Sequence, residues 1–141
     1  MNFIIDSLIV FSITLDSLKI FNLNAKIFEF DNYKIQDETL KISTKSISGI
    51  KNYRIVDKNN NINLGKIYFE KGKSANYFII FFERKDWYAF GITEKLSSIW
   101  INDSVIDLID GQFFYKKLSN TPYKLKVIKN KTIILKEYNF K

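Results

Sequence analysis

The sequence contains no cysteine and no histidine among its 141 residues. The missing cysteines exclude disulfides, thiolate nucleophiles and sulfur ligands for metals, and the missing histidines exclude the commonest general base and transition-metal ligand. Ser-His-Asp catalysis, Cys-His catalysis and histidine-dependent zinc sites are therefore ruled out. We accordingly expect a non-enzymatic protein with no cofactor and no bound metal, although an enzyme that needs neither residue stays open.

Arginine is scarce as well, since only Arg54 and Arg84 occur, and Pro122 is the only proline. Lysine therefore supplies most of the formal net charge of +7. A positive protein ordinarily binds nucleic acid, an anionic membrane or an acidic protein. However, the chain is also rich in Ile, Asn and Phe, and this amino-acid composition is typical of an AT-rich genome. Arginine, which is scarce here, is also the better ligand for phosphates. The charge alone thus identifies no ligand.

The apolar N-terminal segment lacks the features of a membrane anchor or a secretory signal. Asp6 and Asp16 interrupt residues 1–21, no basic stretch precedes the apolar part, and no small-residue cleavage site follows it. We therefore predict no transmembrane segment and a cytoplasmic location. Alternating and β-branched apolar residues favour one long strand here, with a helix over residues 1–15 as the alternative.

The composition that is present favours one folded domain spanning residues 1–141. Hydrophobic residues make up 46% of the chain and charged residues 26%, which is enough apolar surface for a core at this length. Short alternating segments separated by turn residues predict antiparallel strands for most of the chain. These segments are 18–30, 40–44, 53–56, 66–70, 77–83, 87–92, 113–117, 123–128 and 132–138.

The clearest element is a hairpin formed by residues 77–83 and 87–92. Its uninterrupted apolar run predicts a strand buried on both faces. We expect its main apolar side chains to lie in the core, namely Phe78, Ile80, Phe82, Trp87 and Ile92.

The predicted fold class is all-β, with a β-rich α+β fold as the alternative. Residues 93–109 fit either one short helix or two short strands. We expect an antiparallel meander of roughly ten strands that closes as a barrel or as a two-layer sandwich.

Two segments resemble functional motifs but depart from them, and a third group of residues is acidic. Gly72-Lys73-Ser74 ends like a phosphate-binding loop, but the first glycine of that motif is replaced by Ile67. The Asn-rich run that begins at Asp57 is spaced like a calcium loop, but Ile62 and Tyr68 stand where that site needs glycine and glutamate. We interpret both as turns or loops. The remaining acidic group, which we interpret as solvated charge, is Asp103, Asp107 and Asp110.

One set of aromatic and basic residues forms a candidate binding surface. It comprises Arg54, Tyr68, Lys71, Lys73, Arg84, Lys85, Trp87, Tyr88, Lys116 and Lys117. We expect a protein-interaction module, such as an assembly component or an inhibitor, that binds another protein through a sheet edge or an exposed aromatic patch. A module that binds single-stranded nucleic acid is the alternative, because stacking rings interleaved with cations hold single strands. Homo-oligomers through a sheet edge and a barrel around a small apolar ligand also stay open.

Overall fold

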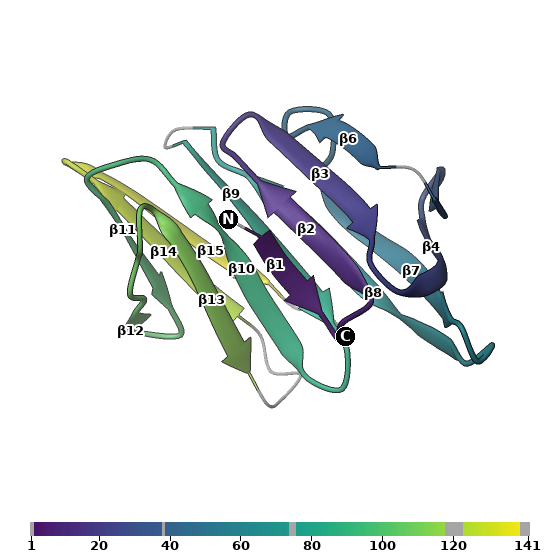
Figure 1. Ribbon diagram of the computed structural model, residues 1–141. Helices are drawn as coiled ribbons and strands as arrows, with labels where there is room; N and C mark the ends of the chain where they lie inside the picture. Colours follow the sequence, from purple (N-terminus) through teal and green to yellow (C-terminus); the bar gives the residue numbers. More distant parts are fainter. Residues whose placement is uncertain (1, 38, 74–75, 118–122, 139–141) are drawn as a thin grey trace.

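The computed structural model describes residues 2–37, 39–73, 76–117 and 123–138, which form fifteen β-strands and no helix (Figure 1). The all-β prediction is therefore confirmed. Fifteen strands are more than the roughly ten predicted, because turns divide several long segments and very short strands occur between them. None of the described segments is a helix with the length and apolar character needed to cross a membrane.

The strands form three antiparallel sheets, which we name A, B and C. In spatial order, sheet A consists of β1 (Asn2–Ile5), β2 (Ile9–Ile13), β3 (Ser17–Asn22) and β6 (Leu40–Ser43). Sheet B consists of β13 (Gln112–Lys117), β10 (Trp87–Thr93), β9 (Tyr77–Glu83), β8 (Ile62–Lys71), β7 (Gly49–Asp57), β4 (Ala25–Phe30) and β5 (Tyr33–Ile35). Sheet C consists of β12 (Ser104–Val105), β11 (Ser97–Ile101), β14 (Tyr123–Lys129) and β15 (Thr132–Tyr138).

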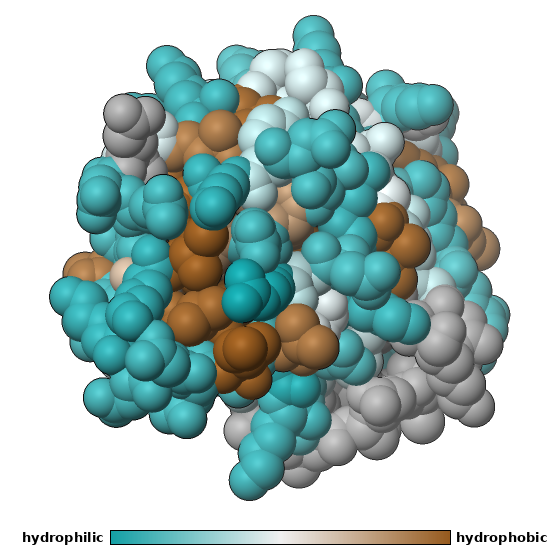
Figure 2. Space-filling model, turned by 90° about the vertical axis from the view of Figure 1, so that its right-hand side faces the viewer, coloured by the Kyte–Doolittle hydropathy of each residue, from teal (hydrophilic) through white to brown (hydrophobic). Residues whose placement is uncertain are grey.

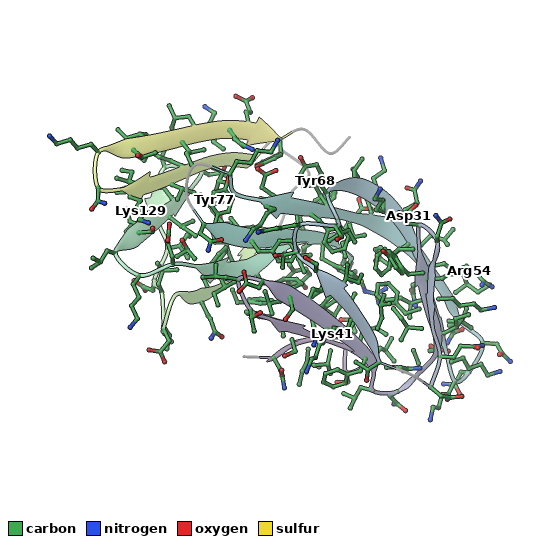
Figure 3. All side chains as sticks on the ribbon, turned by 90° about the horizontal axis from the view of Figure 1, so that it is seen from above. Asp31, Lys41, Arg54, Tyr68, Tyr77 and Lys129 are labelled. Carbon is green, nitrogen blue, oxygen red and sulfur yellow. The ribbon has the colours of Figure 1, made fainter. Side chains whose placement is uncertain are left out.

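Sheet B is the middle layer, with sheet A on one face and sheet C on the other (Figure 3). Strand β9 shows the arrangement most clearly, because its side chains alternate between two cores. Phe78, Ile80 and Phe82 join the cluster shared with sheet A, whereas the side chains between them join the cluster shared with sheet C. This confirms that the apolar run of β9 is buried on both faces. The described strands form a sandwich with a third layer and do not close into a barrel.

The predicted core residues of this hairpin are buried. Phe78, Ile80, Phe82 and Trp87 are each at most 1% exposed, and Ile92 is partly buried against the cluster that faces sheet A. The core prediction is confirmed for the first four residues and holds in part for the fifth.

The single long N-terminal strand predicted from the sequence is wrong. Asp6 and Ser7 adopt left-handed backbone angles, with φ of 51° and 59°, and they turn the chain between β1 and β2. Short polar side chains tolerate this conformation at turns. The predicted strand over residues 18–30 is likewise divided into β3 and β4, which belong to different sheets.

The helix considered for residues 93–109 is also absent, and the two-strand alternative is correct. Leu96 has a φ of 64°, after which β11 pairs with β14 along its whole length. Asn102 and Asp103 then form a left-handed turn into β12. Long-range pairing with β14 therefore decides a segment whose local pattern is ambiguous.

Gly91 lies on β10 directly opposite Ile79 of β9, with no space for a side chain. An added Cβ atom would come within 2.2 Å of the carbonyl oxygen of Phe78 and 2.9 Å of the Cα atom of Ile79. Because both atoms belong to backbone, we expect Gly91→Ala to lower the free energy of unfolding by about 1–3 kcal/mol. Denaturant unfolding measures this loss. Gly91→Ser should cost at least as much, and an unchanged midpoint for both variants would contradict the close approach.

Candidate functional site

The predicted aromatic and basic residues do not form one surface. Tyr68, Lys71 and Lys73 line a pocket of about 710 Å³ beside the C-terminal end of β8. Arg84 and Lys85 line a separate pocket of about 430 Å³, together with Tyr88, at the β9–β10 turn. These pockets lie at opposite ends of β9, about 20 Å apart for a strand of this length. Lys116 and Lys117 pair in register with Tyr88 and Trp87, although their side chains lie outside the described part of the chain.

Three of the predicted cations have partners within the protein. Arg54 forms an ion pair with Glu29 at 2.7 Å, and Arg84 forms one with Asp6. The Lys71 ammonium donates a hydrogen bond to a carbonyl oxygen of the β2–β3 turn at 2.7 Å, and burial lowers its pKa. These contacts reduce the positive charge that is available to phosphates.

Trp87 is wrongly placed in the predicted binding surface. It is 1% exposed and packs in the cluster between sheets B and C, so its ring is closed to a ligand. Tyr88 is partly buried on the opposite face of β10, against the other cluster. The strand alternation that makes Trp87 a core residue thus removes its ring from any surface on which a base could stack.

Trp100 is a partly exposed tryptophan that the sequence analysis overlooked. It lies on β11 between two buried isoleucines and therefore points to the outer face of sheet C. The Lys126 ammonium lies 4.2 Å from the centroid of its ring, and Lys124 and Leu135 line the same pocket of about 410 Å³. The alternation over residues 97–101 would have indicated this position if the segment had been taken as a strand.

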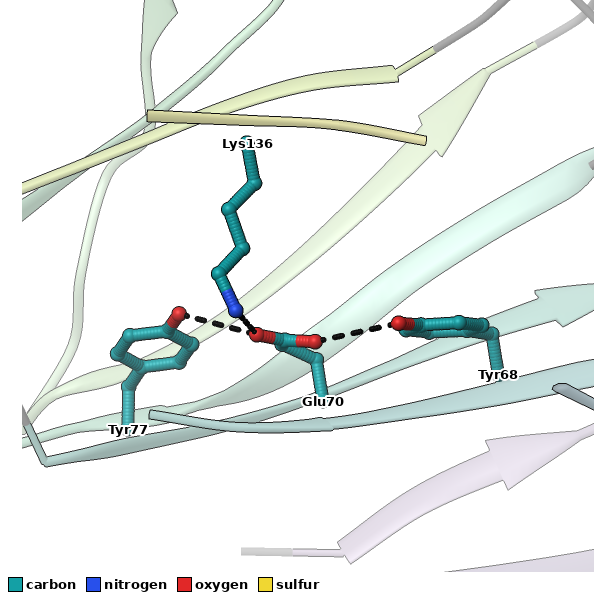
Figure 4. Close-up of polar contacts among 4 residues, drawn as sticks. All are labelled: Tyr68, Glu70, Tyr77 and Lys136. Carbon is teal, nitrogen blue, oxygen red and sulfur yellow. Dashed lines mark hydrogen bonds and ion pairs between the residues drawn. The ribbon is translucent and has the colours of Figure 1, made fainter. Parts of the chain in front are cut away.

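A buried carboxylate, Glu70, connects sheets B and C (Figure 4). The hydroxyl groups of Tyr68 and Tyr77 each donate a hydrogen bond to it at 3.3 Å, and Lys136 of β15 forms an ion pair with it. Burial raises the pKa of Tyr77 and of Tyr138, and the nearby Glu70 carboxylate raises both further. Since these groups come from β8, β9 and β15, the cluster holds sheet C against sheet B.

One of the two motif-like segments stabilises a turn, and the other is only partly described. The Asp57 carboxylate accepts hydrogen bonds from the backbone amides of Asn59 and Asn61, at 2.8 and 2.9 Å, and these bonds lower its pKa. It therefore stabilises the β7–β8 turn, as expected for a loop. Ser74, the last residue of the other segment, lies outside the described residues. Among the residues that are described, no group of three or more His, Cys, Asp or Glu side chains is placed to hold a metal.

A groove of about 430 Å³ lies between β1, the edge strand of sheet A, and β13, the edge strand of sheet B. Three of the apolar residues that line it are largely exposed, namely Ile4 at 58%, Ile109 at 68% and Phe114 at 51%. The groove therefore brings a sheet edge and an exposed aromatic ring to one place.

The groove exists because sheet A ends one strand before sheet B does. Phe3 of β1 packs on Phe90 of β10, with ring centroids 5.0 Å apart, and Figure 1 shows β1 in front of the β9–β10 hairpin. Phe114 of β13 stacks beside the same Phe90 at 6.1 Å. No described strand pairs with the outer edge of β1 or of β13. The apolar face of sheet B thus continues past the edge of sheet A without cover.

The opposite end of sheet B also exposes apolar side chains. Figure 2 shows this side of the molecule, where apolar residues lie among hydrophilic ones. On β7 and β8, Ile50 is 46% exposed, Ile62 56% and Leu64 75%. Leu64 pairs in register with Arg54, so the strand surface here mixes apolar and charged groups.

Comparisons of the chain with protein-family models, with curated proteins and with solved structures give no match. The groove between β1 and β13 is the strongest candidate, because unpaired backbone and exposed apolar side chains coincide there.

Proposed function

We propose that this protein is a non-enzymatic interaction module that binds another protein through the groove between β1 and β13. The observation that carries the proposal is Phe114, which is 51% exposed at a sheet edge beside two further exposed apolar residues. Unpaired sheet edges are aggregation-prone, and natural proteins ordinarily protect them with charge or cover. An apolar groove at such an edge is typical of a surface that a partner covers.

The exposed apolar side chains of the groove supply part of the free energy of binding a partner. Full burial of a large apolar side chain contributes about 1.5–3 kcal/mol relative to exposure. Ile4, Ile109 and Phe114 are each a little more than half exposed, so covering them contributes roughly half of that amount per residue. Backbone hydrogen bonds along an edge add to this contribution, and a micromolar complex requires about 8 kcal/mol in total.

Nucleic-acid binding is the second candidate, and one observation favours it. Trp100 is partly exposed next to Lys124 and Lys126 on the outer face of sheet C, and single-strand binders combine aromatic faces with cations. We rank it second because Lys126 already lies over the indole ring. For either function we propose a cytoplasmic location, which suits a chain without cysteine.

Photo-crosslinking from the groove tests the proposed function. A photoreactive residue at Gln112, which lines the groove, should crosslink a specific protein in an extract of the source cells. The purified partner is then titrated against the wild type, Phe114→Asp and Leu64→Asp, the last being a control on an exposed leucine of β8. We expect Phe114→Asp to weaken the complex at least about tenfold, which is about 1.4 kcal/mol, and the control to change it less than about twofold.

Equal affinity of all three proteins for the crosslinked partner would overturn the groove as the binding site. Micromolar binding of single-stranded oligonucleotides at physiological salt, lost in Trp100→Ala, would instead establish the second candidate. Melting curves of the variants show whether each one is folded.

A further inference from the structure

We infer that the partner enters the groove as one extended strand, which pairs with β1 and becomes the fifth strand of sheet A. This inference rests on the proposed function and specifies how the same groove is filled. It depends on the position of the groove in the layered fold, on the unpaired edge of β1 and on the charge of the groove lining.

The position beside β1 faces β13, because residues of both strands line the groove. Strand β1 covers β10, as the contact between Phe3 and Phe90 shows, and β13 is the next strand of sheet B. Adjacent strands are about 4.8 Å apart within any sheet, and stacked sheets are about 10 Å apart. A strand added to sheet A beside β1 would therefore lie one layer above Phe114. Phe114 is opposite Phe90 in register and stacks with it, so its ring is on the face that such a strand would cover.

The unpaired edge of β1 favours a strand over a helix. A helix has no free backbone groups to pair with this edge, because its own hydrogen bonds use them. An added strand uses the unpaired edge and the apolar floor together.

A second copy of this chain cannot supply the strand through its own β1. Each β1 lies over the β10 of its own copy, as the Phe3 and Phe90 rings show. If two copies paired through β1, the β10 of the second copy would fall where β13 of the first copy lies. The two strands would overlap. Symmetric pairing through β1 is therefore blocked, and the inferred occupant is an extended segment of a different protein, with no second layer of its own beneath it.

The lining of the groove specifies the chemistry of this segment. Its alternate side chains face Phe114 and Phe3, so they should be apolar and bulky. Strand β1 has four residues, which allows roughly four paired residues in the segment. Among the described residues that line the groove, Asp107 alone is charged. A lysine or arginine at that end of the segment would complement it, and Asp110, next to Ile109 in the chain, has the same sign of charge.

Selection of linear peptides tests the mode of binding without a known partner. A phage-displayed library of random peptides is selected on the full-length wild type and counter-selected on Phe114→Asp. We expect enriched peptides with apolar residues at every second position and a lysine or arginine at one end. Asp107→Asn should weaken their binding, and Leu64→Asp should leave it unchanged.

Two measurements on the selected peptides report strand addition specifically. N-methylation of alternate backbone nitrogens should weaken binding at least tenfold for one set of positions and little for the other set. In hydrogen exchange, amides of β1 that point away from β2 should become protected when the peptide binds. Both results depend on backbone pairing, and side-chain contact alone produces neither.

The outcomes separate this inference from the proposed function. Selected peptides with apolar residues at helical spacing, bound without protection of β1, would overturn strand addition while binding at the groove stands. A library that yields no peptide able to distinguish the wild type from Phe114→Asp would also overturn it. The proposed function itself is tested separately, and it fails if the crosslinked partner binds Phe114→Asp as tightly as the wild type.

Discussion

Replacing Phe82 by alanine should lower the free energy of unfolding by about 3–5 kcal/mol. The Phe82 ring is fully buried and stacks on Tyr53, with ring centroids 4.6 Å apart. It also contacts Phe11 of sheet A at 5.8 Å, so it joins two layers. Removing the ring leaves a cavity whose walls belong to paired strands, and these cannot move together without breaking hydrogen bonds. A loss of this size is a large part of the roughly 5–15 kcal/mol that stabilises an ordinary domain.

Denaturant unfolding of Phe82→Ala measures the loss, and Phe114→Ala is the matched control. Both variants remove a phenylalanine from sheet B, but Phe114 is 51% exposed. The control should therefore shift the midpoint by only a small fraction of the shift for Phe82→Ala, with an unchanged dependence on denaturant. Equal shifts for the two variants would show that the layers do not enclose Phe82 as described.

The sequence predicts the core of this fold well where a local pattern has only one physical reading. The six apolar residues from Tyr77 to Phe82 leave no polar face, so the strand must be covered on both sides. The turn at Arg84-Lys85-Asp86 follows in the same way, because four charged residues, Glu83 to Asp86, separate two apolar runs. Burial of Phe78, Ile80 and Phe82 depends only on this pattern and is found in the structure.

The sequence does not predict which strands belong to which sheet. Residues 18–30 alternate without a clear break, yet the turn at Leu23-Asn24 sends β3 to sheet A and β4 to sheet B. Strand β13 pairs with β10, although β11 and β12 lie between them in the chain. Such pairing is decided by packing between distant segments, which a local periodicity does not contain.

The two tryptophans show the same limit at the level of a binding site. Trp87 and Trp100 both lie on strands that alternate, and only the covering sheet decides which ring is accessible. Trp87 is covered by sheet C, whereas Trp100 belongs to the outer face of sheet C itself. Composition therefore shows that the chain has many aromatic rings, but it does not show which of them are exposed. The groove at Phe114 could not be predicted for a related reason, since it depends on sheet A ending one strand early.

Raising the pH above about 10 should destabilise the protein steeply, because buried tyrosines must stay protonated in the folded state. Burial raises the pKa of Tyr77 and Tyr138, and the Glu70 carboxylate adds to the shift. Tyr53 and Tyr68 are shifted in the same direction, chiefly by burial. In the unfolded chain all four ionise near pH 10. The stabilising contribution is thus complete below that pH and is lost as the pH rises toward the folded-state pKa.

The expected size of the alkaline effect follows from the two most strongly shifted residues. Each tyrosine that is ionised only in the unfolded chain costs about 1.4 kcal/mol per pH unit, so Tyr77 and Tyr138 together cost about 2.7 kcal/mol per unit. Denaturant unfolding from pH 8 to about 12 measures this slope, and ultraviolet absorbance of tyrosinate should rise only as the protein unfolds. Tyr77→Phe removes one of the two groups and should reduce the slope by about 1.4 kcal/mol per unit, whatever its stability at neutral pH. A flat stability curve above pH 10, or equal slopes for the two proteins, would mean that the cluster around Glu70 is open to water and does not join sheet C to sheet B.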